Sequence, residues 1–281
     1  MQEIFLDTPR GPLAALRAGD PQGAPLLALH GWLDNAASFV PLMPQLAEFD
    51  LVALDLPGHG ASAHRAPGYE YSFFDWIHDA LDALDALGWP RAHLLGHSMG
   101  AAIATMLACA APDRVDKLVA IEALGPLAGA AETAGERLRA AITARRTAAQ
   151  RPRKPIDSIE SAVRARLAVG DMRVDAARLI VERNLEKVAG GWRWRSDPRL
   201  VLPSHLRITD EAVVSIIAAV EAPTLLIAAD PAPPYFTPEM REARAAKLRD
   251  GRCIVLPGGH HLHMEQPEVV GPIIREFLRN R

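Results

Sequence analysis

The chain has 281 residues, 49% hydrophobic and 23% charged, enough for one large core or for a core with a small accessory domain. The formal net charge of −3 gives no sign of a polyanionic partner, so nucleic acid is not expected as a ligand. No run approaches the roughly 18 apolar residues of a membrane span, and the first residues lack the apolar centre of a signal peptide. We therefore expect a cytoplasmic protein without membrane contact, and assembly as a homodimer stays open.

Short apolar runs alternate with helical patterns along the chain, which is typical of βαβ units and a parallel sheet. The first two runs, residues 3–7 and 13–17, predict an antiparallel hairpin. Runs rich in Leu, Val, Ile and Ala predict strands buried on both faces at residues 26–30, 51–55, 93–96, 118–122, 224–229 and 253–256. Apolar residues at three- and four-residue spacing predict helices near residues 39–48, 72–87, 99–111 and 268–280.

This alternation stops between about residues 125 and 205, where the sequence becomes helical and arginine-rich before the stretch GGWRWRSDPRL. We predict an α/β core formed by residues 1–124 and 206–281, with residues 125–205 inserted as a helical cap or lid. The arginines of this segment could attract an acidic substrate, although such a run is more often a solvated helix face. They are Arg137, Arg139, Arg145, Arg146, Arg151 and Arg153.

The strongest chemical signal is the motif GHSMG, centred on Ser98, which follows the predicted strand RAHLL and precedes the helical stretch AAIATMLACAA. A strand that turns at once into a helix strains the serine backbone, and glycines at either side avoid collisions. The turn leaves the hydroxyl exposed at the carboxyl end of the sheet, near a helix N-terminus that favours negative charge. The motif therefore predicts Ser98 as a catalytic nucleophile.

A serine hydroxyl needs a base at neutral pH, and the chain order serine, acid, histidine directs the search to the C-terminal end. His260 follows two glycines after the last predicted strand and is our candidate base. His261 and His263 compete with it, or else hold the loop in place. A metal site in this histidine cluster is not expected, because no companion carboxylate motif supports one, and no cofactor is expected.

Two carboxylates could orient the histidine and stabilise its charged form. Asp230 ends the predicted strand PTLLIAAD, the commoner position for the acid of such enzymes. Glu122 ends the strand LVAIE, one strand after the nucleophile. The residues alone leave this choice open.

Loops after two earlier strands also carry polar signals. Attack on a carbonyl creates an oxyanion that two backbone N–H groups must stabilise, and Met99 and Trp32 are the candidate donors. His30, which precedes the turn of Trp32, is a candidate for the substrate pocket. Asp55 and His59 in the loop DLPGHG are expected to hold the neighbouring turn by hydrogen bonds.

The motifs HGWLDNAASF, DLPGHGAS, GHSMG, RVDKLVAIEALGP and PGGHHLHMEQPE resemble those of the serine hydrolase-like proteins, a branch of the α/β-hydrolase superfamily. The resemblance covers nearly the whole chain and includes ERNLEKVAGGWRWRSDPRL. It implies the α/β-hydrolase fold, a mostly parallel central sheet flanked by helices. It also implies Ser98 as nucleophile, His260 as base, and oxyanion donors in Trp32 and Met99. In this branch an acidic residue commonly stands at the position of Glu122, which favours Glu122 over Asp230.

The related haloalkane dehalogenases and epoxide hydrolases have Asp as nucleophile. If Ser98 attacked a C–halogen bond or an epoxide, the covalent intermediate would be an ether instead of the hydrolysable ester that Asp forms. We therefore predict a serine hydrolase that cleaves a small-molecule ester, a carboxylesterase-like enzyme. A C–C bond hydrolase, or a perhydrolase resembling haloperoxidases, would use the same residues. A non-catalytic binder of small ligands is the alternative from another class. Further candidates for the pocket are His97, Trp192 and Trp194.

Overall fold

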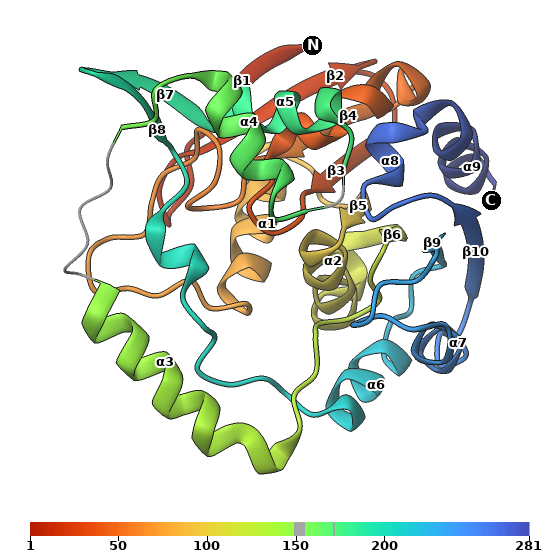
Figure 1. Ribbon diagram of the computed structural model, residues 1–281. Coiled ribbons are helices and arrows are strands. Elements are labelled where there is room, and N and C mark those ends of the chain that lie inside the picture. Colours follow the sequence, from red (N-terminus) through yellow and green to blue (C-terminus); the bar gives the residue numbers. More distant parts are fainter. Residues whose placement is uncertain (149–154, 171, 281) are drawn as a thin grey trace.

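A central eight-stranded sheet organises the protein, whose computed structural model describes residues 1–148, 155–170 and 172–280 (Figure 1). The strand order is β1-β2-β4-β3-β5-β6-β9-β10. The strands β4, β3, β5, β6, β9 and β10 run parallel, whereas β2 pairs antiparallel with both β1 and β4. Their bounds are β1 Gln2–Leu6, β2 Leu13–Gly19, β3 Pro25–Leu29, β4 Asp50–Leu54, β5 Ala92–His97, β6 Val115–Ile121, β9 Thr224–Asp230 and β10 Gly251–Pro257. The predicted mostly parallel sheet with an N-terminal hairpin is confirmed.

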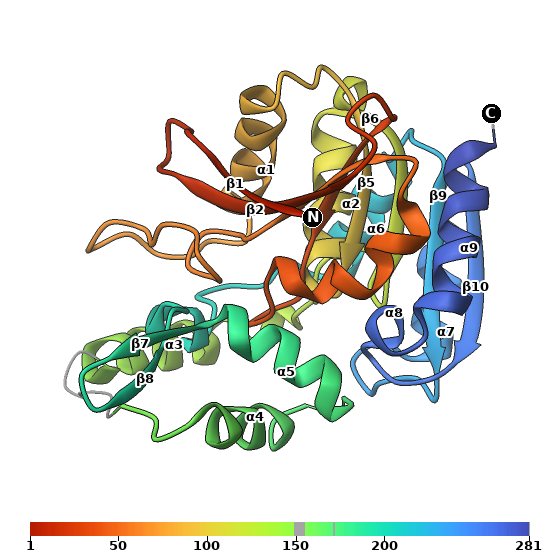
Figure 2. The same cartoon turned by 90° about the horizontal axis from the view of Figure 1, so that it is seen from above.

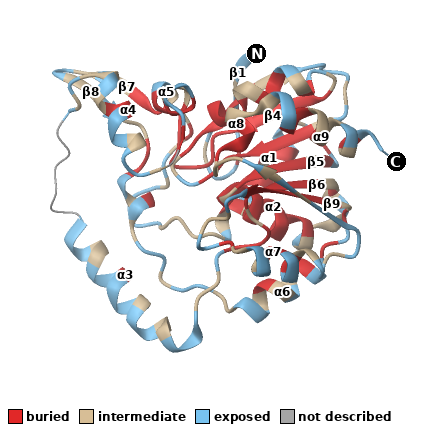
Figure 3. Ribbon diagram, turned by 45° about the vertical axis from the view of Figure 1, so that its right-hand side comes forward, coloured by how far each residue is buried: buried red, intermediate tan, exposed pale blue. Residues whose placement is uncertain are grey.

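Helices cover both faces of this sheet, which explains why its strands read as nearly continuous apolar runs. In β3, Leu27 and Leu29 belong to the core beneath α1 and α2, whereas Leu26 and Ala28 belong to the core beneath η1 and α9. Figure 3 shows the buried strands of the sheet, together with the equally buried helix α2 and the more exposed helices α6 and α7. The helices of the two layers are α1 Asp75–Ala86, α2 Met99–Ala110, η2 Pro112–Arg114, α6 Asp210–Ala218, α7 Pro238–Ala245, α8 Leu262–Glu265 and α9 Pro267–Arg279.

The helix expected near residues 39–48 is a 3-10 helix, η1, over Ala36–Leu46. Pro41 and Pro44 lie inside it and cannot donate backbone hydrogen bonds, which disfavours a regular α-helix. The Asn35 side chain caps its start by accepting a hydrogen bond from the Ala37 N–H. The structure therefore corrects the prediction: the segment is a 3-10 helix and not the α-helix that the spacing of its apolar residues suggested.

Between β6 and β9 the chain forms a separate group of elements, here called the inserted segment (residues 125–205). Figure 2 shows its helices and its hairpin gathered on one side of the molecule. The backbone N–H of Gly129 donates to the carbonyl of Ile208 at 2.9 Å and so joins the start of the segment to the chain just after its end. Its elements are η3 Ala131–Thr133, α3 Ala134–Ala148, α4 Ile159–Leu167, α5 Val174–Arg183, β7 Leu185–Val188, β8 Gly191–Trp194 and η4 Pro198–Val201.

The helices α4 and α5 and the β7–β8 hairpin share a hydrophobic core of their own. Val163, Ile180 and Leu185 are buried in it, together with Met264 of α8 in the main body. Among the described residues, no helix combines the length and the apolar composition needed to cross a bilayer.

Candidate active site

Ser98 lies at the sharp turn between β5 and α2. Its φ of 51° is in the left-handed region, which non-glycine residues rarely occupy. A Cβ atom on Gly100 would lie 1.9 Å from the carbonyl oxygen of Leu29, and one on Gly96 would lie 2.4 Å from the Cα of Ala101. Side chains at either position would therefore break the turn. The strand, turn and helix that the motif predicts are all present.

Ser98, His260 and Glu122 form a continuous line of contacts. The His260 Nε2 is 3.0 Å from the Ser98 Oγ, and the His260 Nδ1 is 3.0 Å from the Glu122 Oε2. A carboxylate oxygen only accepts hydrogen bonds, so the proton of the neutral imidazole lies on Nδ1. Nε2 is then free to accept the hydroxyl proton of Ser98. The His260 side chain is 22% exposed and Glu122 is fully buried.

Glu122 is held from its other oxygen. The Oε1 accepts the backbone N–H of Ala229 at 2.6 Å, and the guanidinium of Arg241 lies 3.7 Å away. Arg241 is itself fixed, because it donates to the carbonyl oxygens of Phe236 at 3.0 Å and Ala229 at 2.6 Å. A buried carboxylate with these partners is both oriented and charge-compensated.

Asp230, the alternative acid, ends β9 with an exposed side chain. Within the part of the chain that the structure describes, this side chain makes no hydrogen bond or ion pair, and only its backbone carbonyl accepts, from the Gly258 N–H. Of the two carboxylates that the sequence left open, Glu122 is therefore the one that contacts His260.

Tyr235 is a further neighbour of His260 that sequence reasoning missed. Its hydroxyl oxygen is 3.3 Å from the His260 Nδ1, and the two rings meet edge to face with centroids 5.9 Å apart. Burial, and then the charge of Glu122, raises the pKa of the Tyr235 hydroxyl. The loop APPYF carries no recognisable motif, and only its position in space reveals this contact.

The candidate oxyanion donors are Met99, the first residue of α2, and Trp32, in the turn after β3. The first N–H groups of a helix have no partner within the helix. Among the described residues, neither backbone N–H donates a hydrogen bond. Trp32 is 51% exposed as a whole residue, and its indole Nε1 donates to the carbonyl of Leu200 in the inserted segment at 3.0 Å.

His30 does not line a pocket, contrary to the sequence-based expectation. It is fully buried, and both ring nitrogens are bound to the backbone: Nδ1 donates to the Gly31 carbonyl at 2.7 Å and Nε2 accepts the Leu56 N–H at 3.0 Å. Burial lowers the pKa of His30 to about 4, so the ring is neutral. His30 therefore holds the loop in place. His59, whose ring packs against that of His30, has the same role.

Trp192 and Trp194 are also placed differently from the expectation. They lie at alternate positions of β8, so both side chains leave the strand on one face, and both pack against the core of the inserted segment. This is a packing role. Of the arginines considered for substrate binding, Arg145 is paired with Glu70 at 2.8 Å, and Arg151 and Arg153 lie outside the described residues.

Neither of two shallow surface hollows formed by described residues is lined by Ser98 or His260. One lies beside the end of α1, around Trp89, and the other lies between α4 and α5, around Met172.

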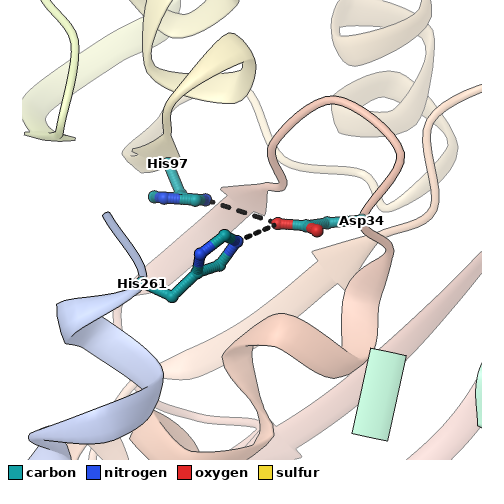
Figure 4. Close-up of side chains that lie close together, drawn as sticks. All are labelled: Asp34, His97 and His261. Atoms are coloured by element: carbon teal, nitrogen blue, oxygen red, sulfur yellow. Dashed lines mark hydrogen bonds and ion pairs between the residues drawn. The ribbon is translucent and has the colours of Figure 1, made fainter. Parts of the chain in front are cut away.

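His97 belongs to a buried cluster with Asp34 and His261 (Figure 4). The Asp34 Oδ2 is 3.2 Å from the His261 Nε2 and 3.6 Å from the His97 Nδ1, while its Oδ1 accepts from the Arg166 guanidinium of α4 at 2.8 Å. Burial lowers the pKa of His97 to about 4. Burial alone would raise the pKa of Asp34, but the two histidines and Arg166 hold it well below its usual range. His97 thus faces the interior and not a pocket.

The ligand atoms of Asp34, His97 and His261 all lie within 4.8 Å of one another, and zinc accepts these ligand types. Arg166 already neutralises Asp34. A divalent ion would therefore add two uncompensated positive charges to a buried site, which is costly. The charges favour a hydrogen-bonded network over a metal centre.

The comparisons with known proteins identify the family of this chain. The family model of the alpha/beta hydrolase fold matches residues 24–267, so the chain belongs to that family. Within the family it belongs to the branch of serine hydrolase-like proteins. Serine hydrolase-like protein 2 of Homo sapiens is 32% identical over 303 residues, covering 99% of this chain and 94% of that one. The serine hydrolase-like protein of Danio rerio is 30% identical over 289 residues, covering 99% and 88%.

A solved structure is also similar over its whole length. A hypothetical protein from Pseudomonas aeruginosa PAO1 matches with a TM-score of 0.93 and 40% identity, and 100% of each chain is covered. The inserted segment is therefore part of an architecture shared with that protein. The resemblance inferred from the motifs is confirmed.

Proposed function

We propose that this protein is a serine hydrolase that cleaves a small-molecule ester through an acyl-enzyme. The observation that carries the proposal is the line of two 3.0 Å contacts from the Ser98 hydroxyl through His260 to the buried Glu122. A nucleophile next to a base that is oriented by a third group is the arrangement that acyl transfer requires.

In the first half of the reaction, the Ser98 Oγ attacks the ester carbonyl while the His260 Nε2 takes the hydroxyl proton. Glu122 stabilises the imidazolium that forms. The backbone N–H groups of Met99 and Trp32 donate to the negatively charged oxygen of the tetrahedral intermediate. His260 then passes its proton to the departing alcohol, and the acyl group stays on Ser98.

In the second half, water attacks the acyl-enzyme and His260 takes its proton. The tetrahedral intermediate collapses, the proton returns to the Ser98 oxygen, and the free acid leaves. Every proton is exchanged between Ser98, His260, substrate and water, so the scheme needs no cofactor.

The inserted segment would act in this scheme as a cap over the substrate. The hydrogen bond from the Trp32 indole to Leu200 supports this, because it attaches the segment to the loop that carries one oxyanion donor. Side chains of the segment would then select the acyl or alcohol part of the substrate.

The test is covalent labelling with a fluorophosphonate, followed by mass spectrometry of the modified peptide. Labelling at Ser98 that disappears in Ser98→Ala is expected. Glu122→Gln and Asp230→Asn form a matched pair: the first should lower kcat on an aryl ester by about 10³- to 10⁴-fold and the second by less than about threefold. Equal losses in both variants would refute the role of Glu122.

Substrate panels separate the alternatives. Turnover of ring-cleavage diketones without turnover of aryl esters would replace the proposal by C–C bond hydrolysis, and peracid formation would indicate a perhydrolase. A folded wild-type protein that neither labels nor hydrolyses esters, yet is stabilised by a small ligand, would be a binding protein.

A further inference from the structure

The backbone of His260 is held by the residue that precedes the nucleophile. The His97 Nε2 lies 2.8 Å from the carbonyl oxygen of His260. A carbonyl only accepts, so this nitrogen carries the proton of the neutral ring and donates it. Because His97 and Ser98 are adjacent in the same turn, one rigid segment fixes both the nucleophile and the position of its base.

A second contact holds the next residue of the same loop. The Asp34 Oδ2 faces the His261 Nε2 at 3.2 Å, and both side chains are buried. The loop residues 260 and 261 are thus tied to the core at two points. Figure 4 shows one oxygen of the Asp34 carboxylate facing both the His97 ring and the His261 ring.

The remaining oxygen of Asp34 connects this network to the inserted segment. Arg166, near the end of α4, donates to the Oδ1 at 2.8 Å across a separation of 132 residues. Of the described side chains, Arg166 supplies the arginine ion pair of Asp34. The other close groups are His261, whose Nε2 faces the Oδ2 at 3.2 Å, and His97, whose neutral ring lies 3.6 Å away and donates from its Nε2 to His260 instead.

We infer that Asp34, His97 and His261 form a buried positioning network for His260, and that the Arg166–Asp34 ion pair makes this positioning depend on the docking of α4. The inference rests on the proposed function for its kinetic readout. Without Arg166 the Asp34 carboxylate is left buried beside two imidazoles. The carboxylate must then rotate, bind a proton or become hydrated by water that enters the site. Each of these changes displaces the loop of His260.

Two variants break the network at different points. Asp34→Asn keeps the size of the side chain, but it replaces one of the two carboxylate oxygens by an NH2 donor. Because Arg166 and His261 face different oxygens, one of the two hydrogen bonds is lost. Arg166→Gln removes the charge and leaves the imidazoles intact. Arg166→Lys keeps the charge and should restore part of the loss.

The structure offers a matched control in Arg183 of α5. It also joins the inserted segment to a buried carboxylate, that of Asp55, at 2.8 Å. Among the described residues, Asp55 makes no hydrogen bond or ion pair with His260 or His261; besides Arg183, its carboxylate accepts the backbone N–H groups of Ala36 and Ala61. Arg183→Gln should therefore lower stability about as much as Arg166→Gln does, without displacing the base.

For each variant, the rate constant of fluorophosphonate labelling and the kcat and KM of an aryl ester are measured well below the melting temperature. Asp34→Asn and Arg166→Gln should lower the labelling rate and kcat by about 10- to 100-fold, with KM within about threefold, because displaced reacting groups lose about this much. Arg183→Gln should stay within about threefold in all of them. Wild-type rates in both network variants, or equal losses in Arg183→Gln, would overturn the inference.

A readout that needs no turnover separates this inference from the proposed function. The His260 Nδ1 proton, held against Glu122, should give a low-field proton resonance in NMR spectra. The resonance should shift or vanish in Arg166→Gln and persist in Arg183→Gln. If wild-type protein does not label, the proposed function fails, and an unchanged resonance in Arg166→Gln would independently refute the network.

His97 supplies one more comparison. Glutamine places an N–H donor close to where the imidazole Nε2 lies, whereas leucine has no donor. His97→Gln should therefore retain more kcat than His97→Leu. Equal kcat values in the two variants would contradict a positioning role for the hydrogen bond to His260.

Discussion

Helices α3 and α5 of the inserted segment are both helical and contain arginine, yet they relate to the rest of the molecule differently. In α3 only Ala141 is buried, and Leu138 and Ile142 are 43% and 45% exposed. In α5 the buried face is continuous and consists of Ala176, Ala177, Ile180 and Val181. Figure 3 shows α3 as exposed over most of its length.

The ion pairs of the segment differ in the same way. Arg145 of α3 pairs with the partly exposed Glu70, whereas Arg166 and Arg183 pair with carboxylates that are almost fully buried, Asp34 and Asp55. The three arginines are similarly buried, so the difference lies in the carboxylates. A carboxylate that stays in contact with solvent loses little without its partner, whereas a buried carboxylate that loses its partner is strongly destabilising. Although both parts of the segment contain arginines, α4 and α5 are therefore held firmly to the main body and α3 is held weakly.

Acid should have the largest effect on the free energy of unfolding. It should act on the main body next to the anchored part of the segment, where neutral histidines are buried. Burial lowers the pKa of His30 and His97 to about 4 and that of His59 to about 3. The unfolded chain binds these protons below about pH 6.5 and the folded chain does not, so stability falls as the pH is lowered. Each such histidine removes about 1.4 kcal/mol per pH unit.

Asp79 acts with the opposite sign, because burial raises its pKa to about 6 and the folded state binds its proton first. One such group offsets about one histidine. Urea unfolding at pH 7, 6 and 5 measures the sum, and we expect a loss of several kcal/mol. A free energy of unfolding that is flat over this range would show that the histidines are not buried as described.

Removing one charge from each kind of ion pair tests the anchoring directly. Arg183→Gln leaves Asp55 buried and unpaired and should destabilise the protein by about 3–5 kcal/mol. Arg145→Gln, the control in α3, should cost less than about 1 kcal/mol. Urea unfolding of both variants at pH 7 provides the comparison, and similar values would remove the proposed distinction between the two regions.

Truncating one isoleucine in each helix tests the packing. Ile180 of α5 is 1% exposed, and Ile180→Ala should cost about 2–4 kcal/mol. Ile142→Ala in α3 should change stability by less than about 0.5 kcal/mol. A large loss in Ile142→Ala would mean that α3 is covered in solution, for example by a second copy of the chain.

Limited proteolysis should show the smallest energetic difference, since it reports local opening. Trypsin should cut after the arginines of α3 before it cuts after Arg178, whose side chain is 41% exposed on the anchored helix α5 and which serves as the control for accessibility. Mass spectrometry of early fragments identifies the order. First cleavage after Arg178 would contradict the conclusion that α3 is held more weakly than α5. The α3 sites are Arg137, Arg139, Arg145 and Arg146.

The sequence contained the parts of the site that depend on local geometry. Ser98 is marked by its glycines within one turn, and His260 by its place after the last strand. The acid was not decided locally, because Glu122 and Asp230 both end strands; the contact with His260 distinguishes them. The resemblance to a known branch had favoured the carboxylate that makes this contact.

The positioning network had no local signal. Asp34 lies within the motif HGWLDNAASF, but its partner Arg166 follows 132 residues later in an arginine-rich stretch where neighbouring arginines look equivalent. Which of them meets a buried carboxylate depends on how α4 packs. Likewise, the spacing of Trp192 and Trp194 places them on one face of a strand without saying what that face covers.

The hydrogen bond between Gly129 and Ile208 closes the inserted segment at its base, before the chain continues into α6 and β9. The segment can therefore be treated as an exchangeable cassette on an intact strand–helix–strand crossover. A cassette grafted from a relative would keep the parent sheet, but it must bring a cation to Asp34 and another to Asp55. The cation that pairs with Asp34 would, under the proposed positioning network, also be needed to place His260 correctly. A graft that changes the substrate range would therefore change catalytic activity as well if it lacked this cation.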